Sequence, residues 1–303
     1  MRLSSFAPLF LALSLAPSLQ GVINRVKAVV AGRVGPPLLQ PYHDLLKLAR
    51  KGAVYSETTT WIFRAGPAAG LAAVIAATPL MPFGAMPALI GFPADFVLLA
   101  YLLALGRFST VLAALDTGSS FEGMGASREV TFAALAEPAF FLGIAALAKQ
   151  GGHLSLSAIV RDISTGTWMR AAPALGLTAG ALLVVFLAEN ARIPVDDPAT
   201  HLELTMIHEV MVLDHCGPDL AMIEYGAALR LWLLGALIVA ILVPWHAGNP
   251  WLDAGAALLG MLGIAVLTGL LESCMARLRL IHIPQLLIGA ALLAALALVL
   301  VVR

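Results

Sequence analysis

The sequence predicts an all-α, polytopic membrane protein of about eight transmembrane helices plus one short amphipathic helix at the membrane surface. Of its 303 residues, 60% are hydrophobic and only 12% are charged, and the mean hydropathy is +0.92. Soluble domains carry about twice that charged fraction, so a single soluble core of this length is excluded. The apolar runs are continuous and lack the alternation of a membrane β-barrel, which leaves helices to cross the bilayer.

Eight apolar runs are long enough to cross a hydrocarbon core about 30 Å thick, which takes about 20 helical residues. They cover roughly 4–30, 58–81, 93–115, 127–149, 169–189, 218–245, 251–275 and 281–302. The first run has features of a signal peptide, but it continues past Ala16 to Val29, so we retain it as a span. We expect residues 1–303 to form a single membrane domain.

The positive charges predict the orientation. Eleven of the 18 Lys and Arg residues lie in or beside the loops after the first, third, fifth and seventh spans, whereas five lie on the other side and two within spans. These loops, residues 31–57, 116–127, 190–217 and 276–281, are therefore expected to face the cytoplasm. Both termini should lie outside, in a cell inner (cytoplasmic) membrane. No chemistry is predicted for the short, apolar outer connections such as 81–93.

The first cytoplasmic loop contains a helical segment, residues 38–51. It follows Gly35-Pro36-Pro37, ends before Gly52, and has apolar side chains on one face and polar ones on the other. At about 14 residues it is too short to cross the membrane and fits the interface. Two roles stay open for it: an anchor on the lipid surface, and a docking site for a cytoplasmic partner.

Charged residues within the spans need a reason, because each costs roughly 2.5–3.5 kcal/mol at the centre of a membrane helix. Glu137, before Pro138, is expected near the midplane, and Arg107 of the third span lies at a similar depth, so the two could pair. Glu224 and Arg230 share the sixth span but are six residues apart and cannot face one another. Two interpretations stay open: static ion pairs between helices, or a protonatable chain reached from the cytoplasm.

The densest polar stretch runs from Glu189 to Glu209 and includes Arg192, Asp196, Glu203 and His208. With Gly35 to Pro41, Asp116 to Glu129 and Glu137-Pro138, it resembles the membrane subunit of respiratory complex I that meets the hydrophilic arm (subunit 1 of that complex). The likeness is closest to the group 4 membrane-bound [NiFe] hydrogenase branch, which includes formate hydrogenlyase subunit 4 and the hydrogenase-4 membrane subunit. Ala191 and Val195 follow the hydrogenase branch, whereas Asp214-His215-Cys216-Gly217 departs from the Glu-Tyr-Ser-Gly that the hydrogenase relatives tend to have.

This resemblance implies that the cytoplasmic loops hold a [NiFe] large subunit and an Fe–S small subunit, and that a carboxylate path leads to antiporter-like membrane subunits. The candidate ion-coupling residues are Glu137, Glu189, Asp196, Glu203, Glu209, Glu224 and Arg107. The candidate docking residues are Arg33, Gln40, Asp44, Lys47, Arg128 and Arg192, of which Arg128 and Arg192 would orient the carboxylates or contact the docked subunit. The [NiFe] centre and Fe–S clusters are expected in partner subunits, with no cofactor, metal or catalytic residue in this chain.

Other patterns give no competing site. Cys216 and Cys274 are far apart and outside any CxxC pair, so they cannot build an Fe–S cluster alone. His201, His208 and His215 recur every seven residues on an expected short helix, which is too wide a spacing for one metal ion. The zero formal net charge gives no reason to expect nucleic-acid binding.

The sequence thus predicts a non-catalytic membrane-anchor and ion-coupling subunit of a formate hydrogenlyase-like [NiFe] hydrogenase, moving protons or sodium. One alternative is a complex I subunit that helps to form a quinone site. Another is an independent cation/proton transporter, although no internal repeat supports it.

Overall fold

The computed structural model describes residues 5–196 and 206–302, and over these ranges the chain is helical without strands. The elements are α1 (Ala7–Val30), α2 (Gln40–Ala49), α3 (Trp61–Ala77), η2 (Thr78–Leu80), α4 (Asp95–Asp116), α5 (Ser120–Gly151), α6 (Leu156–Asp162), α7 (Thr165–Glu189), η3 (Glu209–Val212), α8 (Gly217–Leu242), α9 (Pro250–Cys274), η4 (Leu280–His282) and α10 (Ile283–Val302). In the described ranges, eight helices are long and apolar enough to cross a membrane. The predicted fold class is therefore confirmed.

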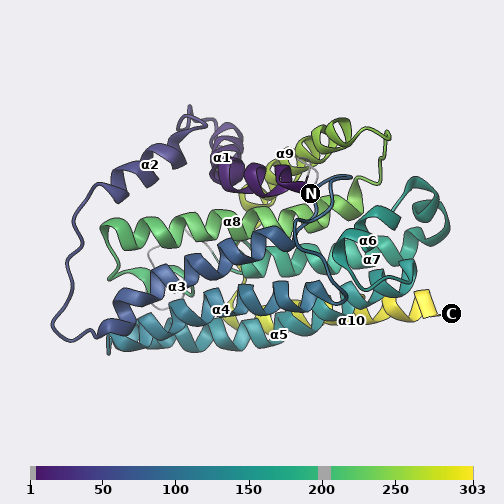
Figure 1. Ribbon diagram of the computed structural model, residues 1–303. Coiled ribbons are helices and arrows are strands. Elements are labelled where there is room, and N and C mark those ends of the chain that lie inside the picture. The colour runs from purple at the N-terminus through teal and green to yellow at the C-terminus, as the bar shows by residue number, and fades with distance from the viewer. Residues whose placement is uncertain (1–4, 197–205, 303) are drawn as a thin grey trace.

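Helix α8 lies at the centre of the bundle. In Figure 1, α1 and α9 lie on one side of it and α3, α4, α5 and α10 on the other. Its most apolar stretch is 72% buried, whereas no other span exceeds 50%. A helix that is apolar all round lies in a protein core or against lipid, and its burial places α8 in the core. The charged residues of α8 are Asp219, Glu224 and Arg230, of which Asp219 and Arg230 are buried and Glu224 is exposed.

Helix α5 is longer than the sequence predicts. It begins at Ser120, so only residues 117–119 connect it to α4, where a loop over 116–127 was expected. The expectation rested on the glycines of this segment. At Gly125, however, an added Cβ would overlap Cγ1 of Val210, so this glycine serves close packing against the segment around η3.

Two other short elements differ from expectation. The predicted short helix around the histidines is the 3₁₀ turn η3, with His208 just before it and His215 three residues beyond it; His201 lies outside the described residues. Helix α6 follows α5 at the opposite end of the bundle and has no counterpart in the sequence prediction. Its seven residues are too few for a periodic pattern to be recognised.

The predicted amphipathic helix is present as α2, which contacts α1 and α8. None of its residues is fully buried. Tyr42 links α2 to α1, because the Tyr42 hydroxyl donates a hydrogen bond of 2.5 Å to the carbonyl oxygen of Ser14. Close approach requires a glycine in α1, because a Cβ at Gly21 would overlap the carbonyl oxygen of Leu38. The position of α2 thus depends on the absence of a side chain at Gly21.

We expect Gly21→Ala to push the Leu38 segment and α2 away from α1, and to lower stability by about 1–3 kcal/mol through overpacking. Thermal unfolding of the purified protein and protease cleavage within 31–57 measure the two effects. Gly180→Ala in α7 is the matched control, because nothing lies within 4 Å of its added Cβ. Equal unfolding temperatures and cleavage rates for the two variants would contradict the packing argument.

Candidate functional site

A polar cavity of about 350 Å³ lies between α1, α2, α8 and the described residues that follow α7, 190–196 and 206–212, which we call the segment after α7. This is the end of the bundle to which the sequence assigns the charged loops. Its polar lining residues are Gln20, Asn24, Asp44, Glu189, Asn190, Arg192, Asp196, His208, Glu209, Glu224 and Arg230. Five carboxylates and two guanidinium groups around one hollow suit water and ions better than an apolar ligand.

The wall formed by α2 differs from the predicted amphipathic pattern. The cavity side carries Pro41, Asp44, Leu45 and Leu48, which follow the i, i+3, i+4, i+7 spacing of one helix face. Asp44, expected on the polar outer face, thus lies on the cavity side, while Leu46 is 56% exposed. Tyr42 and Leu45 of the predicted apolar face still lie against α1 and the cavity, and Asp44 is exposed at the edge of the cavity.

Arg107 joins the carboxylates of two other helices inside the bundle. Its Nη1 lies 2.8 Å from Oε1 of Glu189 at the end of α7, and its Nη2 lies 3.7 Å from Oε1 of Glu137 in α5. The predicted pairing of Arg107 with Glu137 is confirmed, with Glu189 as a closer second partner. Arg107 is 8% exposed, so these carboxylates supply most of the solvation that its guanidinium lacks inside a membrane helix.

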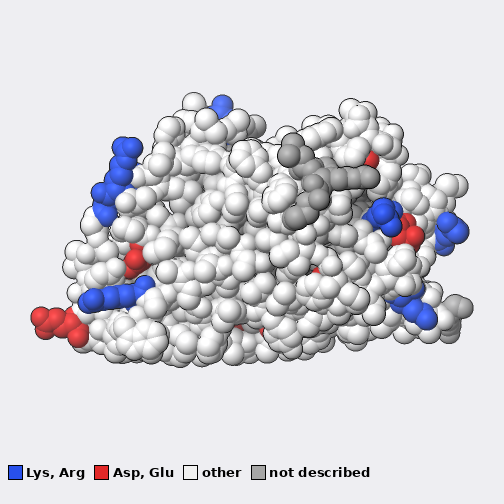
Figure 2. Space-filling view, in the orientation of Figure 1, with Lys and Arg blue, Asp and Glu red and all other residues white. Residues whose placement is uncertain are grey.

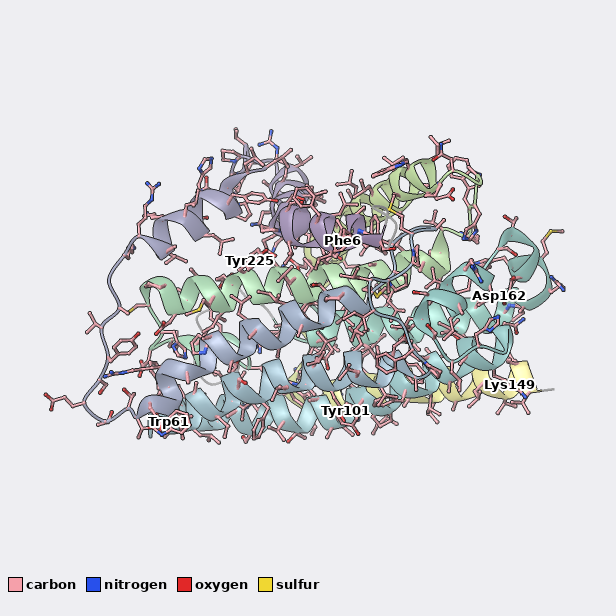
Figure 3. All side chains as sticks on the ribbon, in the orientation of Figure 1. Phe6, Trp61, Tyr101, Lys149, Asp162 and Tyr225 are labelled. Atoms are coloured by element: carbon pink, nitrogen blue, oxygen red, sulfur yellow. The ribbon has the colours of Figure 1, made fainter. Side chains whose placement is uncertain are left out.

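Glu189 lies between two cavities. It lines the large polar cavity, and it also lines a smaller hollow of about 60 Å³ together with Tyr101, Arg107, Glu137 and Phe141. The smaller hollow reaches the lateral surface of α4 and α5, where the Tyr101 residue labelled in Figure 3 is 66% exposed. The Glu137 side chain is 51% exposed, although it lies in the middle of a membrane helix. Glu189 therefore borders both hollows, and Glu137 borders the one that reaches the lateral surface.

The segment after α7 is held in place by Asp196 and Arg128. Asp196 is 3% exposed; its Oδ2 accepts a hydrogen bond of 3.0 Å from the backbone N–H of His208, and its Oδ1 lies 2.8 Å from Nη2 of Arg277. Arg128 of α5 donates a 2.9 Å hydrogen bond to the carbonyl oxygen of Met206. Burial, with the positive charges of Arg230 and Arg107, lowers the pKa of His208 to about 4, so its imidazole is neutral at pH 7.

Arg192 is buried in the same segment. Its Nη1 lies 3.2 Å from Oε1 of Glu272 in α9, and its Nη2 donates to the side-chain oxygen of Gln20 in α1. Lys27 of α1 approaches the other oxygen of Glu272 at 2.7 Å, and the Glu272 side chain is fully buried. The sequence left two roles open for Arg192, orienting carboxylates or contacting a docked subunit. Its buried position beside Glu272 suits the first role.

The remaining candidate docking residues lie on or near the surface. Arg33 and Lys47 are exposed, and Gln40 donates a 2.9 Å hydrogen bond to Asp44 one turn later in α2. Among the candidate coupling residues, Glu209 and Glu224 line the large cavity, whereas Glu203 lies outside the described residues. The structure thus brings Arg107, Glu137 and Glu189 together directly and gathers Asp196, Glu209 and Glu224 around the large cavity.

Three charged residues belong to this network but are missing from the candidates chosen on sequence. Arg230 donates a 3.4 Å hydrogen bond to the carbonyl oxygen of Glu189, and Glu129 lies near enough for its charge to act on Arg107. Glu129 precedes Glu137 by eight residues, which puts both on one face of α5. Glu272 joins α1, α9 and Arg192. Their signal in the sequence was a charge at or inside a predicted span, and Glu129 also ends one of the blocks that carry the resemblance.

The segment Asp214-His215-Cys216-Gly217 connects α8 to the loop before α3. The His215 ring stacks on Phe63 with centroids 4.0 Å apart, and burial lowers the pKa of His215. Cys216 Sγ accepts a 3.3 Å hydrogen bond from the backbone N–H of Val54. Within the described residues, no three His, Cys, Asp or Glu side chains are arranged to hold a metal ion. These contacts give the segment a packing role.

Comparison with known proteins agrees with this architecture. The family described as NADH dehydrogenase matches residues 4–303. Formate hydrogenlyase subunit 4 of Escherichia coli (strain K12) is 28% identical over 93% of this chain and 94% of its own length, and hydrogenase-4 component C of the same organism is 30% identical over 89% and 87%. The NADH-quinone oxidoreductase H subunit of Verminephrobacter eiseniae (strain EF01-2) is 27% identical over 68% and 59%.

A solved structure shares the fold. A chain of the membrane-bound sulfane sulfur reductase, an archaeal respiratory membrane complex, superposes with a TM-score of 0.83 and 21% identity, covering 99% of this chain and 98% of that one. The chain therefore belongs to the NADH dehydrogenase family and is similar to a membrane subunit of NADH-quinone oxidoreductase.

Proposed function

We propose that this chain is the membrane-anchor and ion-coupling subunit of a multisubunit, membrane-bound [NiFe] hydrogenase of the formate hydrogenlyase kind. The two relatives from formate hydrogenlyase and hydrogenase-4 support this assignment, since each aligns over about nine tenths of the chain. Electron transfer would belong to the partners, an Fe–S small subunit and a large subunit with the [NiFe] centre. This chain would hold them at its loop-rich end and link their chemistry to proton or sodium movement.

The observation that carries the coupling role is the position of Glu189 between the two cavities. An ion entering the large cavity from the loop-rich end meets Asp44, Glu209 and Glu224 before it reaches Glu189. From there Arg107 leads to Glu137 at the lateral surface. A half-exposed carboxylate in lipid is unfavourable, so an antiporter-like membrane subunit lying against this surface would cover Glu137 and take the ion onward.

Coupling requires that docked redox subunits interact differently with two states of this path. The segment after α7 is suited to such a role, because it reaches the docking end and also contributes Asp196 and His208 to the cavity. A change in charge at a docked redox centre would alter the protonation of these cavity groups or the position of the segment. Arg33, Gln40 and Lys47 on and beside α2 would contribute to the docking surface.

A quinone site of the complex I kind is the alternative. The similarity to an NADH-quinone oxidoreductase and the volume of the large cavity favour it. The charged lining of the same cavity, by contrast, favours the hydrogenase assignment. Labelling of the region from Glu137 to Glu209 by a photoreactive quinone in the assembled complex would support the alternative instead.

Affinity purification of the tagged chain from gently solubilised membranes tests the proposed function. We expect it to bring down a subcomplex that contains nickel and Fe–S clusters, detected by metal analysis and mass spectrometry. A tag on an unrelated polytopic protein of the same membrane is the control. Recovery of a metal-free oligomer of this chain alone would contradict the assignment.

We expect Glu137→Gln to leave assembly and electron transfer intact while lowering redox-driven ion movement by roughly tenfold or more, because the amide cannot accept a proton. Ion uptake into proteoliposomes during turnover, measured beside hydrogen evolution, separates the two effects. Glu57→Gln, in the exposed loop before α3, is the matched control. Normal uptake in the Glu137 variant would remove this residue from the path.

We expect Arg192→Ala to impair assembly or electron transfer, because it removes one of the two cations paired with the buried Glu272 and the hydrogen-bond donor that Arg192 offers to Gln20. The yield of intact complex and its hydrogen evolution report the effect. Arg50→Ala, at an exposed position, controls for loss of a positive charge. Unaltered yield and activity would show that the Arg192 pair is dispensable.

A further inference from the structure

A second hollow lies at the end of the bundle opposite the large cavity of the candidate site. It has the greater volume of the two, and the proposed function does not use it. It has a volume of about 770 Å³ and lies between residues 82–93, which connect η2 to α4, and residues 152–161, which include most of α6. Its size falls within the range of small-molecule sites, about 300–1,000 Å³. His153, Ser155, Ser157 and Arg161 are the polar side chains of its wall.

The two walls of this outer pocket are joined by hydrogen bonds. Asp95 at the start of α4 is fully buried, and it accepts bonds of 2.8 Å from the Ser155 hydroxyl and from the backbone N–H of Leu156. Ser157 Oγ accepts a 3.0 Å bond from the backbone N–H of Ala88. The hollow is therefore formed by the fold itself and does not depend on a bound molecule for its shape.

Positive charge gathers at this end of the bundle, where Arg161 lines the pocket and Lys149 and Arg170 lie beyond its wall. Between residues 149 and 170 the sequence has three cations, Lys149, Arg161 and Arg170, and one acid, Asp162. All four side chains are exposed, and within the described residues none of them has an ion-pair partner within 4.0 Å. Figure 2 shows blue side chains around a red one at this end, and Figure 3 labels Lys149 and Asp162 there. The excess charge runs against the cation-poor composition of the other outer connections.

Apolar side chains lie exposed beside these cations. Leu154 is 57%, Phe92 39% and Ile90 49% exposed. The pocket also lies where α4 begins and α5 ends, so it is level with the boundary between lipid tails and headgroups. A site for a small soluble anion needs no apolar rim, whereas a phospholipid presents a phosphate and acyl chains together.

We propose that the outer pocket binds the headgroup of an anionic phospholipid. Arg161 contacts its phosphate from the pocket wall, Lys149 attracts the phosphate from beyond the wall, His153 and Ser155 offer further hydrogen-bonding groups, and the acyl chains lie along Phe92 and Leu154. The headgroup thereby offsets positive charges that face the outer leaflet, and it holds the ends of α4, α5 and α6 together. The site is separate from the ion path, so it stands whether or not the proposed function is correct.

The test measures lipid retention by native mass spectrometry of the intact complex in neutral detergent, with phosphatidylglycerol or phosphatidylcholine added. We expect phosphatidylglycerol to be retained preferentially, and Lys149→Gln with Arg161→Gln to weaken retention by about fivefold for each charge removed. Arg50→Gln with Lys51→Gln is the matched control, because both cations are exposed at the opposite end. All substituted positions are on the surface, and equal unfolding temperatures verify that the variants fold.

Three results would overturn the proposal. The first is equal retention of phosphatidylglycerol by the Lys149/Arg161 double variant and the control. The second is equal retention of phosphatidylcholine and phosphatidylglycerol by the unaltered protein. The third is loss of a protein subunit from the double variant with lipid retention unchanged, which would assign the charges to a protein interface.

Discussion

The poor solvation of charge inside a membrane is the constraint on which the rest of this structure depends, and Arg107 is where it acts most strongly. Its guanidinium group lies in a membrane helix at 8% exposure, with carboxylates of α5 and α7 beside it. Removing either carboxylate would leave a buried positive charge short of partners. Helices α4, α5 and α7 are thereby fixed relative to one another at the point where the large cavity meets the lateral hollow.

The same constraint organises the loop-rich end. Glu272, fully buried, binds cations from α1 and from the segment after α7, and Asp196 binds that segment to Arg277. These pairs connect α1 and α9 with Arg192 and Asp196, which line the large cavity. Several paired groups thus border one cavity, and a subunit docked at this end would act on more than one of them at once.

Much of the fold could be predicted from the sequence, because span length and hydropathy reflect a physical requirement that acts locally. All eight spans and the surface helix α2 are present, and apart from α5, which begins seven residues before its predicted start, they lie within a few residues of their predicted limits. The pairing of Arg107 with Glu137 could also be predicted, since both charges lie at similar depth. The position of Asp44 beside the cavity and the length of α5 could not, because they depend on surfaces that distant segments provide: α1 and α8 for Asp44, and Val210 for Gly125. The shared position of Glu189 requires knowing how α4, α5 and α7 pack, which no local pattern contains.

The central claim is that glutamates of the inner network change protonation with the redox state of a docked partner. Infrared difference spectroscopy of the assembled complex, oxidised against reduced, measures this most directly. The account predicts a protonated-carboxyl band that changes with redox state, shifts in heavy water and disappears in Glu189→Gln but persists in Glu57→Gln. A spectrum without any carboxyl change, or with a band that Glu189→Gln leaves intact, would contradict the account and leave these pairs as static contacts between helices.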